Sequence, residues 1–177
     1  MNRPHHSRRA PARQRTTAMP KKLPQVAAAA ALILKPGREK SLLRRHPWVF
    51  SGAVERIAGN PGNGDTVAVC DAAGGFLAWA GYSAHSQISA KVWSCQADEK
   101  IDADFFRRRI EQALALRRDL GIAQHGDGMR LIHGESDGLP GLLVDRYGDV
   151  LVMQLGTAAA ERWRDACADI LQELLAP

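Results

Sequence analysis

Two kinds of hydrophobic spacing divide the sequence. From about residue 32 to residue 94, short apolar runs alternate with turns rich in glycine, proline and asparagine, a pattern typical of short β-strands. Strands are expected at residues 32–34, 48–54, 65–70, 75–82 and 87–93. Several short strands in one compact stretch indicate a small β pseudo-barrel.

One short helix is expected inside this strand-rich region. Residues 38–46 can form a helix with Leu42 and Leu43 facing inward and basic side chains outside. Pro47 is expected to end it, because a proline disfavours the α conformation at the preceding residue, His46.

Helical spacing dominates after a polar segment at residues 97–100. Asp102 is expected to cap a helix over residues 103–120, and Thr157 a helix that runs to Leu175. Strands at 129–132, 139–146 and 150–155 lie between them. The first helix is expected to bury Phe106, Ile110, Ala113, Leu114 and Leu120, to end at Gly121, and to expose Arg107, Arg108, Arg109, Arg117 and Arg118. The expected fold class is a β pseudo-barrel followed by a partial α+β domain whose thin second layer indicates a fragment.

Charge divides the chain into three parts. Residues 1–25 carry a net charge of +7 without any acidic residue, whereas residues 26–97 carry +3 and residues 98–177 carry −5. We therefore expect a disordered basic arm at 1–25, which contacts phosphates or serves only as a solubilising extension, and two domains at 26–97 and 98–177.

Composition excludes several classes of protein. No apolar run approaches the roughly 18 residues that a membrane-spanning helix requires. The three cysteines, Cys70, Cys95 and Cys167, are too widely spaced for a zinc knuckle or a disulfide framework, so a reducing, cytoplasmic setting is expected. Their positions at strand ends and in an apolar helix favour packed thiols over nucleophiles.

The loops offer one candidate for small-molecule chemistry. Glu135, Asp137 and Asp145 could hold a metal or act as acid and base in a self-contained hydrolase. The alternative is that aspartates in glycine-rich loops fix turn geometry through hydrogen bonds to the backbone. Neither glycine-rich loop, at residues 59–64 or 134–141, matches a dinucleotide or P-loop fingerprint.

A basic cluster with neighbouring aromatic residues is the strongest candidate site. Cations of this kind bind phosphates, and a nearby ring can stack on an unpaired base. The alternative is a solvated helix with Trp48 and Phe50 in the core, and spacing alone does not separate the two. The cluster comprises Lys35, Arg38, Lys40, Arg44, Arg45, His46 and Trp48.

Two long motifs carry a family resemblance. The stretches GREKSLLRRHPWVFSGAV at residues 37–54 and RLIHGESDGLPGLLVDRYGD at residues 130–149 resemble the amino-terminal half of the bacterial 23S ribosomal RNA large-subunit methyltransferase I family. The resemblance covers residues 32–177. It implies a PUA domain that binds RNA, then a central α/β domain, then an S-adenosylmethionine-binding domain that methylates cytosine C5.

The chain departs from the family pattern in its extra basic arm and in stopping inside the central domain. None of its cysteines matches the family's catalytic motif, so the resemblance assigns no catalytic, cofactor or metal residue here. It implies RNA contacts at Arg38, Lys40, Arg44, Arg45, His46 and Trp48.

The resulting expectation is an RNA-binding fragment, inactive alone, with 23S ribosomal RNA as its partner. A protein-interaction module is the third possibility, beside this function and the hydrolase. An unpaired sheet edge in the incomplete domain would also favour self-association.

Overall fold

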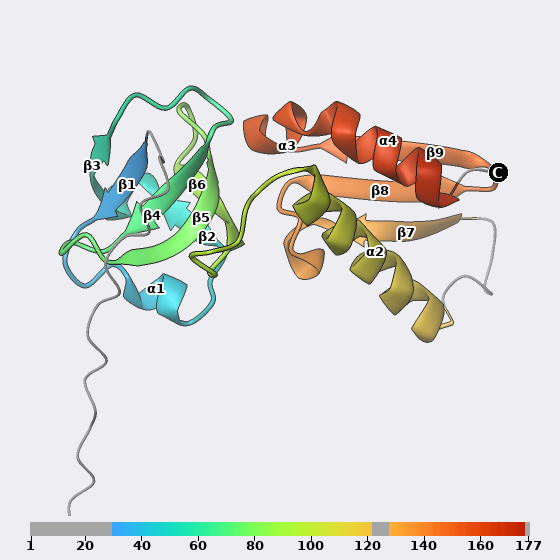
Figure 1. Ribbon diagram of the computed structural model, residues 1–177, viewed down its shortest axis with the longest axis horizontal. Helices are drawn as coiled ribbons and strands as arrows, with labels where there is room; N and C mark the ends of the chain where they lie inside the picture. Colours follow the sequence, from blue (N-terminus) through green and yellow to red (C-terminus); the bar gives the residue numbers. More distant parts are fainter. Residues whose placement is uncertain (1–29, 122–127, 176–177) are drawn as a thin grey trace, which may run out of the picture.

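A computed structural model describes residues 30–121 and 128–175. The basic arm expected at residues 1–25 lies outside the described residues. Figure 1 shows a curled sheet on one side and a smaller sheet with long helices on the other, joined by the segment before α2.

The first sheet has six strands in the order β2-β6-β5-β4-β1-β3. All neighbouring strands are antiparallel except β1 and β4, which are parallel. Together with the strand-rich curl in Figure 1, this order confirms the expected pseudo-barrel. The strands are β1 (Ala31–Leu34), β2 (Trp48–Phe50), β3 (Val54–Ala58), β4 (Thr66–Cys70), β5 (Phe76–Tyr82) and β6 (Ile88–Ser94).

Strand β4 lies at the centre of this sheet and is buried on both faces. Val67 and Val69 face one apolar cluster, together with Leu32 from β1. Ala68 and Cys70 face a second, smaller cluster that contains Trp79. Burial on both sides explains why β4 is apolar along nearly its whole length.

The helix expected at residues 38–46 is shorter than predicted. Only α1 (Lys40–Leu43) is helical, and the chain turns at Arg45, whose φ is +65°. A four-residue helix is a single turn, so it buries only one apolar side chain: Leu42 is in the core, whereas Leu43 is 66% exposed. The prediction that both leucines face inward is therefore wrong.

The single strand expected at residues 48–54 is also wrong. A 3₁₀ turn, η1 (Ser51–Ala53), divides it into β2, which pairs with β6, and β3, which pairs with β1. The apolar run continues through the turn, so hydrophobic spacing alone does not reveal the break.

The second sheet has three antiparallel strands in the order β7-β8-β9. Helices α2 and α4 pack against each other and share one core cluster with this sheet. The elements are α2 (Ala103–Asp119), β7 (Gly128–His133), the 3₁₀ turn η3 (Gly134–Asp137), β8 (Leu142–Tyr147), β9 (Val150–Leu155), α3 (Ala158–Arg162) and α4 (Arg164–Leu175).

Both predicted helix caps are confirmed. The Asp102 carboxylate accepts a hydrogen bond from Phe105 N, and the Thr157 hydroxyl accepts one from Ala160 N. The helix that begins at Thr157 does not run unbroken to Leu175, because it is interrupted at Trp163 between α3 and α4.

Three further expectations for this region are wrong. Leu120 is 63% exposed, because it follows the last helical turn of α2. Arg117 is buried, because it pairs with Asp137 instead of facing solvent. The strand expected from residue 139 begins only at Leu142, since Gly138 and Gly141 have left-handed φ values of +69° and +86°.

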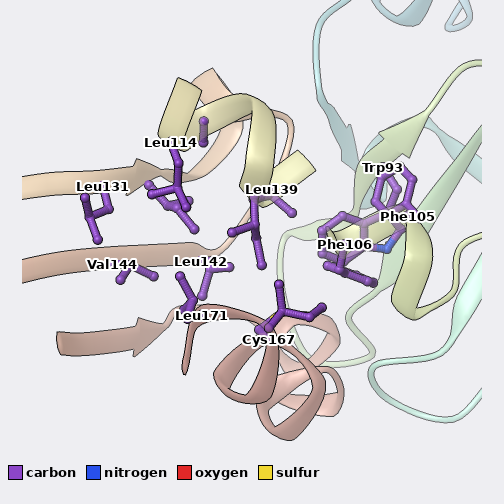
Figure 2. Close-up of a cluster of buried hydrophobic side chains, with 14 of the residues drawn as sticks. Trp93, Phe105, Phe106, Leu114, Leu131, Leu139, Leu142, Val144, Cys167 and Leu171 are labelled. Atoms are coloured by element: carbon purple, nitrogen blue, oxygen red, sulfur yellow. The ribbon is translucent and has the colours of Figure 1, made fainter. Parts of the chain in front are cut away.

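The two halves of the fold pack on one another through helices α2 and α3. Trp93 of β6 extends into the core of the second sheet, where its ring meets Phe106 at a centroid distance of 5.3 Å (Figure 2). A Cβ at Gly81 of β5 would overlap the Cβ of Ala159 in α3, so only glycine permits this approach. Within the described residues, no helix is both long and apolar enough to cross a membrane.

Candidate nucleic-acid interface

Four cations of the predicted cluster lie on one exposed segment around α1. Arg38, Lys40, Arg44 and Arg45 are all exposed, and none forms an ion pair within the described part of the chain. Lys35 differs, because its ammonium donates to the Gly52 carbonyl at 3.0 Å. The four cations are therefore available to an anionic ligand without breaking an ion pair in the described structure.

A hydrogen-bonded turn at the end of α1 holds the backbone of Arg45 and His46. His46 N donates to Ser41 O, and Arg45 N donates to Leu42 O, which is the Schellman pattern that satisfies the last carbonyls of a helix. The left-handed position of this motif normally holds glycine, but here it holds Arg45. Pro47 follows directly and prevents the helix from continuing.

Three aromatic side chains lie immediately after this turn. The ring of Trp48 is 5.7 Å from that of His46 and 6.1 Å from that of Phe50, both edge-on. Trp48 N also donates to His46 Nδ1 at 3.2 Å. Phe50 is 47% exposed and Trp48 is half-buried, so the alternative that places both rings in the core is wrong.

A hollow of about 320 Å³ opens between α1 and β2. Its lining includes the rings of Trp48 and Phe50, the polar side chains of Arg38 and Ser41, and apolar side chains from the barrel core. Its volume lies at the lower end of the range found for small-molecule pockets. A planar, unpaired nucleobase matches this combination of aromatic faces and a nearby cation.

Sequence reasoning missed two residues beside this cluster, Lys91 and Glu135. Lys91 of β6 lies opposite Trp48 of β2 in the sheet, and its ammonium is 5.5 Å from the centroid of the Trp48 ring. Glu135 of η3 accepts from Lys91 Nζ at 2.7 Å and from Trp48 Nε1 at 2.9 Å. Partial burial opposes ionisation of Glu135, but these two hydrogen bonds, a hydrogen bond to its own backbone and the charge of Lys91 together outweigh it and keep the pKa of the carboxyl below its ordinary value.

The three carboxylates proposed for a hydrolase do not form one site. Asp137 pairs with Arg117, Asp145 with Arg130, and Glu135 with Lys91. The hydrogen bond and charge of Arg130 lower the pKa of Asp145. No group of three or more potential metal-ligating side chains occurs among residues 30–121 and 128–175. Asp137 also accepts from the backbone N of His133, which is the turn-fixing role given as the alternative.

The cysteines have the character of packed thiols. Burial raises the pKa of Cys70, with a further contribution from Asp71, and raises that of Cys167 to about 12. A thiol with a raised pKa is a poor nucleophile at neutral pH, so neither residue resembles a catalytic cysteine.

The described residues do not fit S-adenosylmethionine. Nucleotide-type cofactors bind where a glycine-rich turn links a parallel strand to a helix. The described connections from a strand into an α-helix, at residues 35–39, 95–102 and 156–157, each contain at most one glycine. The connection at residues 95–102 follows β6, an antiparallel strand of the barrel. The connection at residues 156–157 follows β9, which belongs to a wholly antiparallel sheet.

Comparison with known proteins gives consistent results. A family model described as a PUA-like domain matches residues 32–95. The chain is 57% identical to Ribosomal RNA large subunit methyltransferase I of Erwinia tasmaniensis and 52% identical to that of Yersinia pestis, each over 141 residues. These matches include 80% of this chain but only 36% of each relative.

Two solved structures share the fold. One, from Streptococcus mutans and described as a SAM-dependent methyltransferase, has a TM-score of 0.68 at 18% identity and covers 81% of this chain and 37% of its own. The other, SMU.776, described as a methyltransferase complexed with SAH, has a TM-score of 0.71 at 17% identity over the same shares. The family resemblance expected from the two motifs is thus confirmed: the chain is a homologue of the ribosomal RNA large subunit methyltransferase I family over about a third of those proteins' length, with a PUA-like domain at residues 32–95.

Proposed function

We propose that this chain is the RNA-recognition portion of an S-adenosylmethionine-dependent methyltransferase that acts on cytosine C5 of 23S ribosomal RNA. Residues 26–97 would form the RNA-binding domain and residues 98–177 the central domain. The observation that carries the proposal is the set of exposed cations that form no ion pair among residues 30–121 and 128–175, beside an aromatic hollow and inside the segment that matches a PUA-like domain. The proposal includes a cytoplasmic location, since bacterial ribosomal RNA is found there.

The residues divide into two roles in this proposal. Arg44 and Arg45, with Lys35, Arg38 and Lys40, bind phosphates, for which forked or flexible cations are suited. Trp48 and His46 contact an unpaired base at the hollow, because stacking on an aromatic face is how proteins read single-stranded RNA. A rigid turn holds both groups together, so a structured RNA can match their spacing.

The chain's own part is binding rather than methyl transfer. Two of its three thiols are buried with raised pKa values, and the connections into its helices do not fit the cofactor. We expect calorimetry with S-adenosylmethionine to give no saturable heat. A stoichiometric binding isotherm would overturn this part of the proposal.

A salt titration of RNA binding tests the recognition surface. Affinity for protein-free 23S ribosomal RNA transcript and for an unrelated structured RNA is measured for the wild type and for Arg44→Ala/Arg45→Ala. The matched control is Arg56→Ala/Arg118→Ala, which removes the same charge from two exposed positions on β3 and α2. The slope of log K against log salt falls by about 0.7 for each phosphate of single-stranded RNA that the variant no longer neutralises.

The expected result is a loss of preference for ribosomal RNA in the α1 variant alone. If both double variants weaken binding to both RNAs equally, the surface attracts RNA without recognising it. If the wild type binds neither RNA, the chain is better described as a protein-interaction module. Metal-dependent turnover of an ester substrate would instead support the hydrolase alternative.

A further inference from the structure

The two sequence motifs that carry the family resemblance meet at one carboxylate. Glu135, in the second motif, accepts hydrogen bonds from Trp48, in the first motif, and from Lys91. Trp48 and Glu135 are 87 positions apart in the sequence and belong to different halves of the fold. Glu135 is therefore the point at which the second half of the chain contacts the aromatic group of the candidate interface.

Glu135 is held by a rigid turn. Within η3, Asp137 receives two hydrogen bonds from the Arg117 guanidinium, at 2.6 and 2.8 Å, and its side chain is only 4% exposed. Gly134 and Gly138, with φ values of +53° and +69°, lie at the two ends of the turn in left-handed conformations. The Arg117–Asp137 pair therefore anchors η3 to α2 only two residues from Glu135.

Four side chains in turn contact the Trp48 ring. Its N–H edge is tied to Glu135, the Lys91 ammonium lies near its face, and His46 and Phe50 meet it edge-on. The ring also contributes to the lining of the hollow beside α1. A stacking ring held in one orientation loses little conformational entropy when a base binds.

We propose that Glu135 is a positioning residue for RNA recognition, which holds Trp48 in its base-stacking orientation and neutralises Lys91. This inference rests on the proposed function and deepens it. The positioning of Trp48 raises the preference for an RNA whose unpaired base can stack on this ring. The neutralisation of Lys91 lowers attraction to RNA in general, because Lys91 is kept from acting as an additional phosphate contact.

Two substitutions separate these effects. Glu135→Gln keeps an oxygen that can accept from Trp48 but removes the charge that neutralises Lys91. Glu135→Ala removes both the oxygen that accepts from Trp48 and the charge that neutralises Lys91. The matched control is Asp65→Asn, which removes one negative charge from another ion pair between the two halves, Asp65 with Arg162 at 2.7 Å, and keeps an acceptor for the Gly62 N–H.

The measurements are affinity for 23S ribosomal RNA transcript and for a structured RNA of equal length, together with the indole N–H resonances of the RNA-free protein. In Glu135→Ala we expect the ratio of the two affinities to fall by about tenfold, the order of one hydrogen bond to a charged group. In Glu135→Gln the ratio stays within about twofold, while affinity for both RNAs rises. Asp65→Asn leaves the ratio unchanged.

The NMR readout does not depend on RNA. The Trp48 N–H signal should shift and exchange faster with solvent in Glu135→Ala, and less so in Glu135→Gln. If this signal is unaffected, or if the signal moves but the affinity ratio does not, Glu135 has no positioning role and the inference is overturned. If the wild type binds no RNA, the proposed function fails, and the inference fails with it.

Discussion

Arg45 is in a conformation that costs free energy for any residue but glycine. It is the one non-glycine residue with positive φ among the described residues, and it occupies the turn that ends α1. The left-handed conformation costs an L-residue roughly 1–2 kcal/mol. Strained positions of this kind concentrate at functional sites, which agrees with the proposed role of Arg45 in phosphate binding.

We predict that Arg45→Gly separates stability from binding. Glycine relieves the strain but adds freedom to the unfolded chain, so the free energy of unfolding should stay the same or rise by up to about 1 kcal/mol. Affinity for RNA should fall at low salt and change little at high salt. Urea unfolding and a salt titration measure the two quantities. Unchanged affinity at every salt concentration would show that Arg45 contacts no phosphate.

Two Arg–Asp pairs on this chain differ mainly in burial, and this difference predicts their contribution to stability. The Arg117–Asp137 pair is buried, whereas Arg130 in the Arg130–Asp145 pair is 41% exposed. Asp137→Ala leaves a buried guanidinium without its partner and should cost roughly 3–5 kcal/mol. Asp145→Ala should cost at most about 1 kcal/mol. Equal losses in urea denaturation would contradict this ranking.

Among the secondary-structure elements, β9 has a poorly protected edge. Within the described residues it pairs only with β8, and it contains no charged residue or proline and exposes Val150 and Val152 by 60% and 48%. Edge strands usually carry charges or proline that prevent pairing with another chain. The self-association expected from the sequence therefore remains a prediction, and the structure suggests the edge of β9 as its interface.

We predict that the chain associates through β9 as its concentration rises. Val152→Lys places a charge on this edge and should shift the equilibrium toward the monomer by about tenfold or more. Sedimentation equilibrium of both proteins measures the change. Lys substitution at Leu43, an exposed leucine on α1, serves as the control and should leave the association unchanged.

Sequence patterns predict the elements well where residues near one another in the sequence determine the structure. The apolar residues of α2 recur with a helical period, β4 to β6 are short apolar runs separated by turn residues, and the caps at Asp102 and Thr157 follow from single residues. Sequence patterns fail where a residue far away in the sequence determines whether a side chain is buried. Arg117 is buried only because Asp137 lies opposite it, and spacing along the helix does not contain that information.

The candidate site is predictable only in part for the same reason. Its cations and Trp48 are adjacent in the sequence, so their clustering is visible there. Lys91 and Glu135 reach Trp48 only through the pairing of β2 with β6 and the packing of η3 on the barrel. Glu135 contacts Lys91, which is 44 positions away in the sequence, and Trp48, which is 87 positions away. Local periodicity cannot predict contacts over such separations.

At the scale of the whole molecule, the contact between Gly81 and Ala159 sets how closely α3 approaches the barrel strand β5. Gly81→Ala introduces a methyl group that overlaps Ala159, so α3 must move away from β5. We predict a loss of about 1–3 kcal/mol in unfolding free energy. Gly52→Ala is the control, because a Cβ there meets no atom within 4 Å and should change stability by less than about 1 kcal/mol. Equal unfolding free energies of the two variants would show that α3 moves away from β5 without a loss of stability.

The position of Trp93 in the shared core also has a consequence for biosynthesis. On a ribosome, β6 emerges before α2 and long before α3, so the barrel strands leave the exit tunnel before the residues that bury Trp93. The nascent barrel therefore exposes the indole of Trp93 until Phe106, and later Ala159, pack in the same core cluster. During that interval the apolar surface around Trp93 is open to chaperones and to other nascent chains.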